Sequence, residues 1–306
     1  MMAAMQPNRP AFMDGLRGQL LMNEPMSRHT SWRVGGKAEY FYTPADKADL
    51  VKMLKQLPVS VPVYWVGLGS NLLVRDGGVD GMIVRTARGL SEIEYIEPNI
   101  IRAQAGVSSA KIARVSANNG LTGVEFLAGV PGSFGGALAM NAGAFGGETW
   151  PWVLEVECVD RWGVLHVFSS QEIDYRYRAA DIPPDHWITE GKLKLNFAPE
   201  GWLGKEKIRS LLDKRSASQP IQSANAGSVF QNPKGGFAAE FIEKAGWKGK
   251  KIGGAEVSMT HANFIINTGE ANASNIIELI EGIQQNVLDQ FNVQLTTEVR
   301  VIGVPA

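Results

Sequence analysis

The pattern of apolar and polar positions predicts a chain that mixes helices with short strands. Residues 45–57 carry Leu50, Leu54 and Leu57 near helical spacing and stop at Pro58, and residues 274–291 carry a long apolar stripe that starts after Ser274 at the expected cap position. The other segments with a helical pattern are 108–120, 205–215 and 237–246. Apolar runs of strand length occur at 63–66, 72–74, 82–84, 152–159, 164–169, 187–195, 262–267 and 296–303.

Glycine interrupts these elements unusually often. The chain has 34 glycines among 306 residues, about 11% where about 7% is average, and they gather at 67–81, 120–147 and 227–254. The absence of a three-residue period excludes collagen, and 12 Phe, 8 Trp, 6 Tyr and only 15 Pro argue against disorder. We therefore expect the glycines to shape specific loops of a folded protein.

Charge, cysteine content and hydropathy mainly exclude classes of protein. The net charge is −1, from 30 basic and 31 acidic residues, so no basic field for nucleic acid is expected. Cys158 is the only cysteine and lies in an apolar run, which favours a buried strand residue over a reactive thiol. Residues 1–19 show no leader pattern, and no apolar stretch reaches about 18 residues. A cytoplasmic protein without membrane spans is the expectation.

The first glycine cluster follows a predicted strand and joins Gly67 and Gly69 to Ser70 and Asn71. Two interpretations stay open from these residues, a tight turn and a loop whose backbone receives a phosphate. It is not the Rossmann fingerprint, because Leu72 stands where the third glycine would be, and the chain contains no phosphate-binding G-x-x-x-x-G-K-[ST] loop.

The second glycine cluster is dominated by small side chains from 128 to 146. Gly132 and Gly136 form a GxxxG spacing, but Pro131 and Asn141 interrupt the span, so a membrane helix is discounted. Small side chains let backbone amides approach a large flat or polyanionic ligand, and we favour this interpretation over packing alone.

Several polar residues could carry chemistry, and each also has a structural interpretation. Tyr175–Arg178 could be the solvated face of a strand or an anion clamp. Ser228 could be a turn serine or a catalytic one. Glu298, in an apolar C-terminal run, could be an edge-strand residue or a carboxyl with a shifted pKa. The histidines at 29, 166, 186 and 261 are scattered, so no metal site is predicted.

Four sequence motifs, in order, resemble one enzyme family. GLGSNLLVRDGGVDGMIV and EFLAGVPGSFGGALAMNAGAFGGE are similar to the FAD-binding domain of the vanillyl-alcohol-oxidase superfamily. NAGSVFQNP and TEVRVIG narrow the resemblance to the UDP-N-acetylenolpyruvoylglucosamine reductases, and the short distance from Ser228 to His261 resembles their shorter subtype. The resemblance implies non-covalent FAD, NADPH as hydride donor, and a sugar-nucleotide substrate of peptidoglycan precursor synthesis.

The resemblance also implies roles for individual residues. Arg178, Ser228 and Glu298 fall on the catalytic positions: a cation that stabilises an enolate, an acid that protonates it, and a carboxyl that organises the site. Tyr177, Arg215 and Asn232 fall on substrate positions. The positions assigned to FAD are Arg33, Gly35, Gly36, Gly67, Leu68, Gly69, Ser70, Asn71, Gly129, Pro131, Gly132, Ser133, Gly135, Gly136, Asn141, Ala142 and Gly143.

The expected fold is α+β, with a two-lobed FAD-binding domain and a smaller α+β substrate-binding domain. The first lobe covers 1–86, with 299–306 rejoining it, the second covers 87–203, and the substrate domain covers 204–298. The alternatives are a flavin oxidase of the same superfamily and a non-catalytic nucleotide-sugar-binding protein. Protein partners are not indicated.

Overall fold

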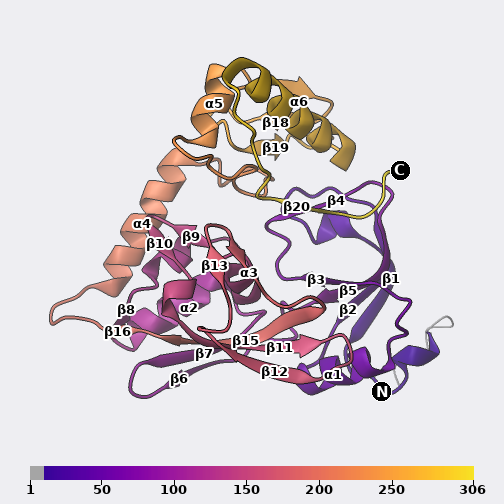
Figure 1. The fold of residues 1–306 in the computed structure, drawn as a ribbon, viewed down its shortest axis with the longest axis vertical. Helices are drawn as coiled ribbons and strands as arrows, with labels where there is room; N and C mark the ends of the chain where they lie inside the picture. Colours follow the sequence, from indigo (N-terminus) through magenta and orange to yellow (C-terminus); the bar gives the residue numbers. More distant parts are fainter. Residues whose placement is uncertain (1–9) are drawn as a thin grey trace.

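The computed structural model describes residues 10–306, which form three groups of secondary structure (Figure 1). Residues 1–9 lie outside the described residues. They are the start of the expected first lobe and of the N-terminal segment discussed above. Two groups contain the larger sheets, and the third stands above them in the view. Helix α4 (Gly204–Ser218) leads into this third group, and strand β20 (Arg300–Ile302) leads back out of it.

The first group is a four-stranded sheet with helix α1 (Lys47–Gln56) packed against it. Asp46 caps α1 by accepting a hydrogen bond from the Asp49 amide, and Leu50 and Leu54 are buried, as the pattern at 45–57 predicts. Strands β2 and β3 both pair in parallel with β5. In sheet order the strands are β1 (Gln19–Pro25), β2 (Lys37–Thr43), β5 (Val79–Arg85) and β3 (Val63–Val66).

The second group is a five-stranded antiparallel sheet covered by helices α2 (Ser109–Asn118) and α3 (Phe134–Ala139). The sequence pattern did not predict α3, because two adjacent glycines in so short a segment have low helix propensity. Cys158 is fully buried in this sheet, which raises the pKa of its thiol to about 12, as expected of a structural cysteine. In sheet order the strands are β12 (Leu165–Ser169), β11 (Val153–Asp160), β15 (His186–Lys194), β7 (Ile100–Gln104) and β6 (Ile93–Ile96).

The third group packs the apolar stripe of helix α6 (Ala273–Phe291) against a small sheet and helix α5 (Ala238–Lys244). The cap of α6 is Asn272 and not Ser274: Asn272 and Asn275 bond each other's backbone amides, and Ser274 already lies in the first turn. The expected strand at 262–267 is shorter, since only its end pairs with a neighbour. The strands in order are β17 (Lys251–Ile252), β18 (Ala255–Val257) and β19 (Ile265–Asn267).

Strand β20 pairs in parallel with β4 (Leu72–Val74), so the end of the chain returns to the first group. The expected strand at 296–303 is reduced to these three residues. Two further contacts hold the third group in place: Asp76 accepts hydrogen bonds from the Ala273 and Ser274 amides at 2.8 Å, and the Trp32 indole donates to Ile265 O at 2.7 Å. The remaining strands are β8 (Leu121–Thr122), β9 (Gly143–Ala144), β10 (Gly147–Glu148), β13 (Tyr175–Arg176), β14 (Ala179–Ala180) and β16 (Asn196–Phe197).

No helix within residues 10–306 has the length and apolar character needed to cross a membrane.

Candidate functional site

All three groups contribute residues to one cavity of about 870 Å³. Its size lies near the upper end of the range of about 300–1,000 Å³ that is usual for small-molecule sites. Both of the first two glycine clusters line it, and so do side chains from the third group. The predicted site residues in its wall are Gly67, Leu68, Gly69, Ser70, Asn71, Gly129, Pro131, Gly132, Ser133, Gly136, Ala142, Gly143, Arg178, Arg215, Ser228 and Glu298.

The first glycine cluster forms the loop between β3 and β4. At Gly69 the backbone has φ +66° and passes so close to the His29 carbonyl that a Cβ would overlap its oxygen, which explains the glycine. The backbone N–H groups from Gly67 to Asn71 donate no hydrogen bond to any described residue. Five consecutive free donors at the wall of a cavity are a surface for an anion, which favours the ligand-binding interpretation over the simple turn.

The second glycine cluster meets the first across the cavity wall. The Ser70 hydroxyl donates to Pro131 O at 2.6 Å, and Gly67 lies so close to Ser133 that a side chain there would collide with the serine hydroxyl. Ser133 also caps α3 by accepting from the Gly136 amide. Because the facing side chains are small, the backbone itself forms much of the surface. A flat dinucleotide with a diphosphate, such as FAD, fits this combination of free amides and small residues.

Arg215 adds a positive charge to the same wall. From α4 its Nη1 donates to Gly129 O at 2.8 Å, and its Nε donates to Gln219 at 2.9 Å. No carboxylate among the described residues pairs with it. Burial lowers the pKa of this guanidinium, which still remains charged because its ordinary pKa is so high. A half-buried cation without an acidic partner is suited to a phosphate or carboxylate of a ligand.

Five residues of the expected cofactor set lie outside the cavity wall, and all of them except Arg33 have packing partners instead. Gly35 and Gly36 approach the backbone of Val74 and Asp76, next to the exposed Arg33. Gly135 faces Ala105 of the second group. Asn141 is fully buried and joins the Trp150 amide, Glu148 and Arg176 O through its side chain.

Arg178 reaches the cavity from the two-residue turn between β13 and β14. Its backbone has φ +60°, and its guanidinium lies over the Tyr177 ring at 4.7 Å and contacts Gly143 O at 3.3 Å. Its neighbour Arg176 differs, since it is an exposed residue that pairs with Asp181 at 2.6 Å. The hairpin therefore presents Arg176 to solvent and Arg178 to the cavity, and the anion clamp stays a prediction for Arg178.

Glu298 is the partner of Arg178 in the cavity. Nε of Arg178 lies 3.1 Å from Oε1 of Glu298, and the two side chains are only 17% and 19% exposed. Burial raises the pKa of the Glu298 carboxyl, although the Arg178 charge acts in the opposite direction. The backbone of Glu298 is held at both ends, because its amide donates to Val229 O at 2.7 Å and its carbonyl accepts from the Asn71 side chain at 3.0 Å.

Ser228 is brought beside Glu298 by this backbone pairing. Its hydroxyl lines the cavity and has no hydrogen-bond partner among the described residues. Buried Asn263 fixes the segment that follows, with its Oδ1 accepting from the Phe230 amide and its Nδ2 donating to Phe230 O. The other two substrate candidates are outside the wall: Tyr177 is exposed, and the Asn232 side chain accepts from the Ala238 amide at the start of α5.

Sequence reasoning missed several residues of the wall. Trp65 and Trp187 stack at 5.5 Å between ring centroids, and His186 lies next to them. No motif marks these residues, because they come from strands of two different sheets. Only the complete fold brings them to the cavity.

Comparison with known proteins gives consistent results over nearly the whole chain. Residues 38–169 match the model of an FAD binding domain, and residues 219–302 match that of the UDP-N-acetylenolpyruvoylglucosamine reductase C-terminal domain. Proteins named UDP-N-acetylenolpyruvoylglucosamine reductase from Methylococcus capsulatus and Thiobacillus denitrificans are 48% and 46% identical, over 94% of this chain and 94% and 93% of theirs. The crystal structure of the reductase of that name from Thermus caldophilus superposes with a TM-score of 0.78 at 30% identity, covering 94% of this chain and 99% of the other. The α+β fold predicted from the sequence is confirmed.

Proposed function

This chain belongs to the UDP-N-acetylenolpyruvoylglucosamine reductase family, and we propose that it performs the family reaction with Arg178, Ser228 and Glu298. The reaction is the FAD-dependent reduction, with NADPH, of the enolpyruvyl group of UDP-N-acetylglucosamine enolpyruvate, in peptidoglycan precursor synthesis. The observation that carries the assignment of residues is the convergence of these three side chains in the cavity that both glycine clusters line.

The residues proposed to hold FAD are those of the first two glycine clusters that line the cavity, with Arg215 as a cation for a phosphate of FAD or substrate. When bound, FAD supplies the hydride that reduces the substrate double bond. The free amides from Gly67 to Asn71 support an anionic group at this loop. The positions outside the wall, among them Asn141 and Gly135, support the site by packing.

Arg178 is proposed to stabilise the negative charge that develops on the substrate. Hydride addition to the terminal carbon of the enolpyruvyl group leaves charge on the adjacent carbon and on the carboxylate, as an enolate. A fixed guanidinium in a half-buried site stabilises such charge more strongly than water does. Glu298 orients this guanidinium through the 3.1 Å contact.

Ser228 is proposed to protonate the carbon next to the carboxylate. Its hydroxyl hydrogen moves to that carbon, and the serine regains a proton from solvent or substrate-bound water. A serine is a weak acid in water, so this role depends on exclusion of water and on partners supplied by the ligands. The absence of a protein partner for its hydroxyl supports a group kept available for the substrate.

The same proposal divides the chain at the boundaries expected from the sequence. Residues 1–86 and 87–203 are the FAD-binding lobes, 204–298 bind substrate, and 299–306 rejoin the first lobe, which the β20–β4 pairing supports. Tyr177 and Asn232 remain proposed substrate contacts that would have to turn toward the ligand. The proposed location is the cytoplasm, where NADPH and nucleotide sugars are available.

An anaerobic absorbance experiment tests the function. Addition of NADPH to the purified yellow protein should bleach the flavin absorbance, and the enolpyruvyl sugar nucleotide should then restore it without oxygen. Failure of the second step, with recovery only after air is admitted, would favour a flavin oxidase, which the family assignment does not support. Acid precipitation is the check on the cofactor linkage: colour should leave the protein, as expected for non-covalent FAD.

A further inference from the structure

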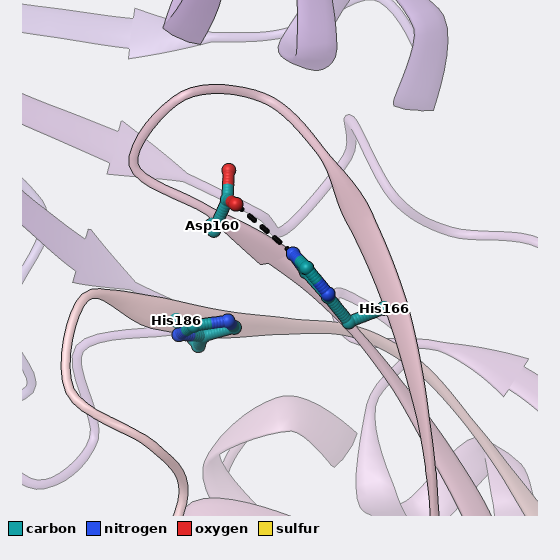
Figure 2. A group of neighbouring side chains, drawn as sticks. All are labelled: Asp160, His166 and His186. Atoms are coloured by element: carbon teal, nitrogen blue, oxygen red, sulfur yellow. Dashed lines mark hydrogen bonds and ion pairs between the residues drawn. The ribbon is translucent and has the colours of Figure 1, made fainter.

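A second group of chemically competent side chains lies beside the cavity and has no part in the reaction described above. Asp160, His166 and His186 each present one ligand atom, and these three atoms lie within 4.8 Å of one another. Figure 2 shows Asp160 and His166 facing each other, with the His186 ring beside them. The residues come from the end of β11, from β12 and from the start of β15.

The strand register explains why they meet. Asp160 is directly opposite His186 across the β11–β15 ladder, and the β11–β12 hairpin folds His166 back toward Asp160. No metal site was predicted from the sequence, because the spacing of these histidines along the chain matches no metal-binding motif. Antiparallel pairing of three strands creates a proximity that linear spacing does not show.

Asp160 is a rigid ligand. Its side chain is only 9% exposed, and its Oδ1 accepts hydrogen bonds from the Trp162 and Val164 amides, both at 2.9 Å. Its Oδ2 lies 2.9 Å from Nε2 of His166. An ion about 2.1 Å from both atoms would subtend an angle of about 90° between them, so this pair would open slightly to reach the tetrahedral angle that zinc prefers. The proton on His166 Nε2 occupies the place that such an ion would take.

His186 is already held in the tautomer that a metal requires. Its Nδ1 lies 2.8 Å from Pro184 O. A carbonyl oxygen only accepts, so Nδ1 carries the proton and Nε2 of the neutral ring keeps a free lone pair. Metal-binding histidines commonly donate their other ring N–H to a backbone carbonyl in this way.

We propose that Asp160 Oδ2, His166 Nε2 and His186 Nε2 bind a divalent transition-metal ion of the zinc type. Two imidazoles and one carboxylate are a ligand set that suits Zn²⁺, and three protein ligands leave a position for water. At tetrahedral angles, ligand atoms about 2.1 Å from one ion are about 3.4 Å apart, so any pair near the 4.8 Å limit must close by up to about 1.4 Å. Binding requires the neutral His166 ring to carry its proton on Nδ1 instead of Nε2, so that Nε2 offers its lone pair to the ion and the ring stays neutral.

The position of the site gives it a consequence for the cavity. His186 also belongs to the cavity wall, and the next residue, Trp187, stacks on Trp65 of the first group. A bound ion would tie β12 to β15 at this edge and restrict the part of the wall that His186 forms.

Calorimetric titration of the tag-free, chelator-treated, FAD-loaded protein with Zn²⁺ tests the proposal. We expect one ion per chain, and a loss of affinity of about tenfold or more in His186→Ala and in His166→Gln. His29→Gln is the matched control, because His29 pairs with Glu24 at the same 2.9 Å distance without a second imidazole nearby, and it should bind as the original chain does. Binding that survives both substitutions, or no saturable binding, overturns the proposal.

A second measurement uses the unsubstituted chain, so it tests the proposal even if the histidine variants do not fold. With Co²⁺ in place of Zn²⁺, proton NMR should show a strongly shifted exchangeable resonance from the His186 Nδ1–H that stays bonded to Pro184 O. An unshifted spectrum with Co²⁺ present would show that no imidazole of this chain binds the ion.

Discussion

The guanidinium Nε of Arg178 lies 3.1 Å from the carboxyl Oε1 of Glu298, although the two residues are 120 positions apart in the sequence. The Nε–H has no well-aligned hydrogen-bond acceptor among the described residues despite this short distance. Glu298 therefore positions the guanidinium by charge and not through an aligned hydrogen bond, and the guanidinium keeps donors free for a ligand carboxylate. A bidentate guanidinium can serve both partners at once, which a lysine ammonium does less well.

Replacement of Arg178 by lysine should slow substrate reduction by about 10²- to 10³-fold, because the charge remains but the fixed fork of donors is lost. Flavin reduction by NADPH should change little. The matched control is Arg176→Lys in the same hairpin, since Arg176 pairs with exposed Asp181 outside the cavity wall. Stopped-flow absorbance separates the two half-reactions. Equal effects of both substitutions would contradict the assigned role of Arg178.

Replacement of Glu298 by glutamine should increase the free energy of unfolding at neutral pH while decreasing activity. Burial raises the pKa of Glu298 above its ordinary value of 4.5, so the ionised carboxylate lowers the stability of the folded state. Below pH 4.5 the carboxyl is protonated in both states, and the advantage of the variant should vanish. Between pH 4.5 and the raised pKa of the folded state, the original chain loses stability as the pH rises. Above that pKa the difference in the free energy of unfolding between the two proteins reaches its full size.

Urea unfolding at several pH values measures this difference. Glu240→Gln, at an exposed position of α5 beside Lys244, is the control and should show a smaller change with pH. If Glu298→Gln were less stable than the original chain at neutral pH, the expected sign would be wrong. The loss of the Arg178 contact would then cost more stability than is gained by removing a buried charge.

Replacement of Ser228 by alanine should leave reduction of FAD by NADPH intact and slow reduction of the sugar nucleotide by about two or more orders of magnitude. The hydroxyl lines the cavity without a protein partner, so its removal leaves no buried group unsatisfied, and folding should be preserved. Ser223→Ala, in the same loop but outside the wall, is the control. Unchanged turnover in Ser228→Ala would remove the serine from the role of acid.

Local signals in the sequence predicted most of the helices and part of the strands, whereas β1, β2, β6 and β7 of the two larger sheets were not predicted. Helix α1 and the strands β11, β12 and β15 follow strong periodicity and lie within one or two residues of expectation. Helix α3 was missed because two adjacent glycines lower the helix propensity of so short a segment. Ser274 was predicted as the α6 cap, but its hydroxyl bonds Asp76 of the first group, a tertiary contact without a local signal.

For the site, short motifs located single residues but not their neighbours. Gly67–Asn71 and Ser228 could be found because their loops carry fixed sequence patterns. The stacked Trp65 and Trp187, and the Asp160–His166–His186 cluster, depend on the pairing of strands that are distant in sequence. A single sequence contains no information on that pairing beyond turn and periodicity signals.

The adjacent glycines of α3 give a test that separates ligand binding from packing. Gly136 lines the cavity, and a Cβ added there would have only one neighbour within 4 Å, the Ser133 hydroxyl oxygen at the ordinary distance of 3.7 Å. Gly135 faces the sheet, where a Cβ would lie 2.7 Å from the Ala105 Cβ. Gly136→Ala should therefore fold and gain up to about 1 kcal/mol in the apoprotein from helix propensity.

In the same variant the new methyl group would occupy the ligand surface, so FAD affinity should fall by tenfold or more, which corresponds to about 1.4 kcal/mol. Gly135→Ala should lower the melting temperature of the apoprotein. The FAD affinity of its folded fraction should not change, so this variant should lose FAD only to the extent that it unfolds. Thermal melts with and without FAD, together with fluorescence titration of the cofactor, measure both effects. Unchanged FAD affinity in Gly136→Ala would mean that the cofactor does not contact this face of α3, and the proposed FAD surface would then have to exclude it.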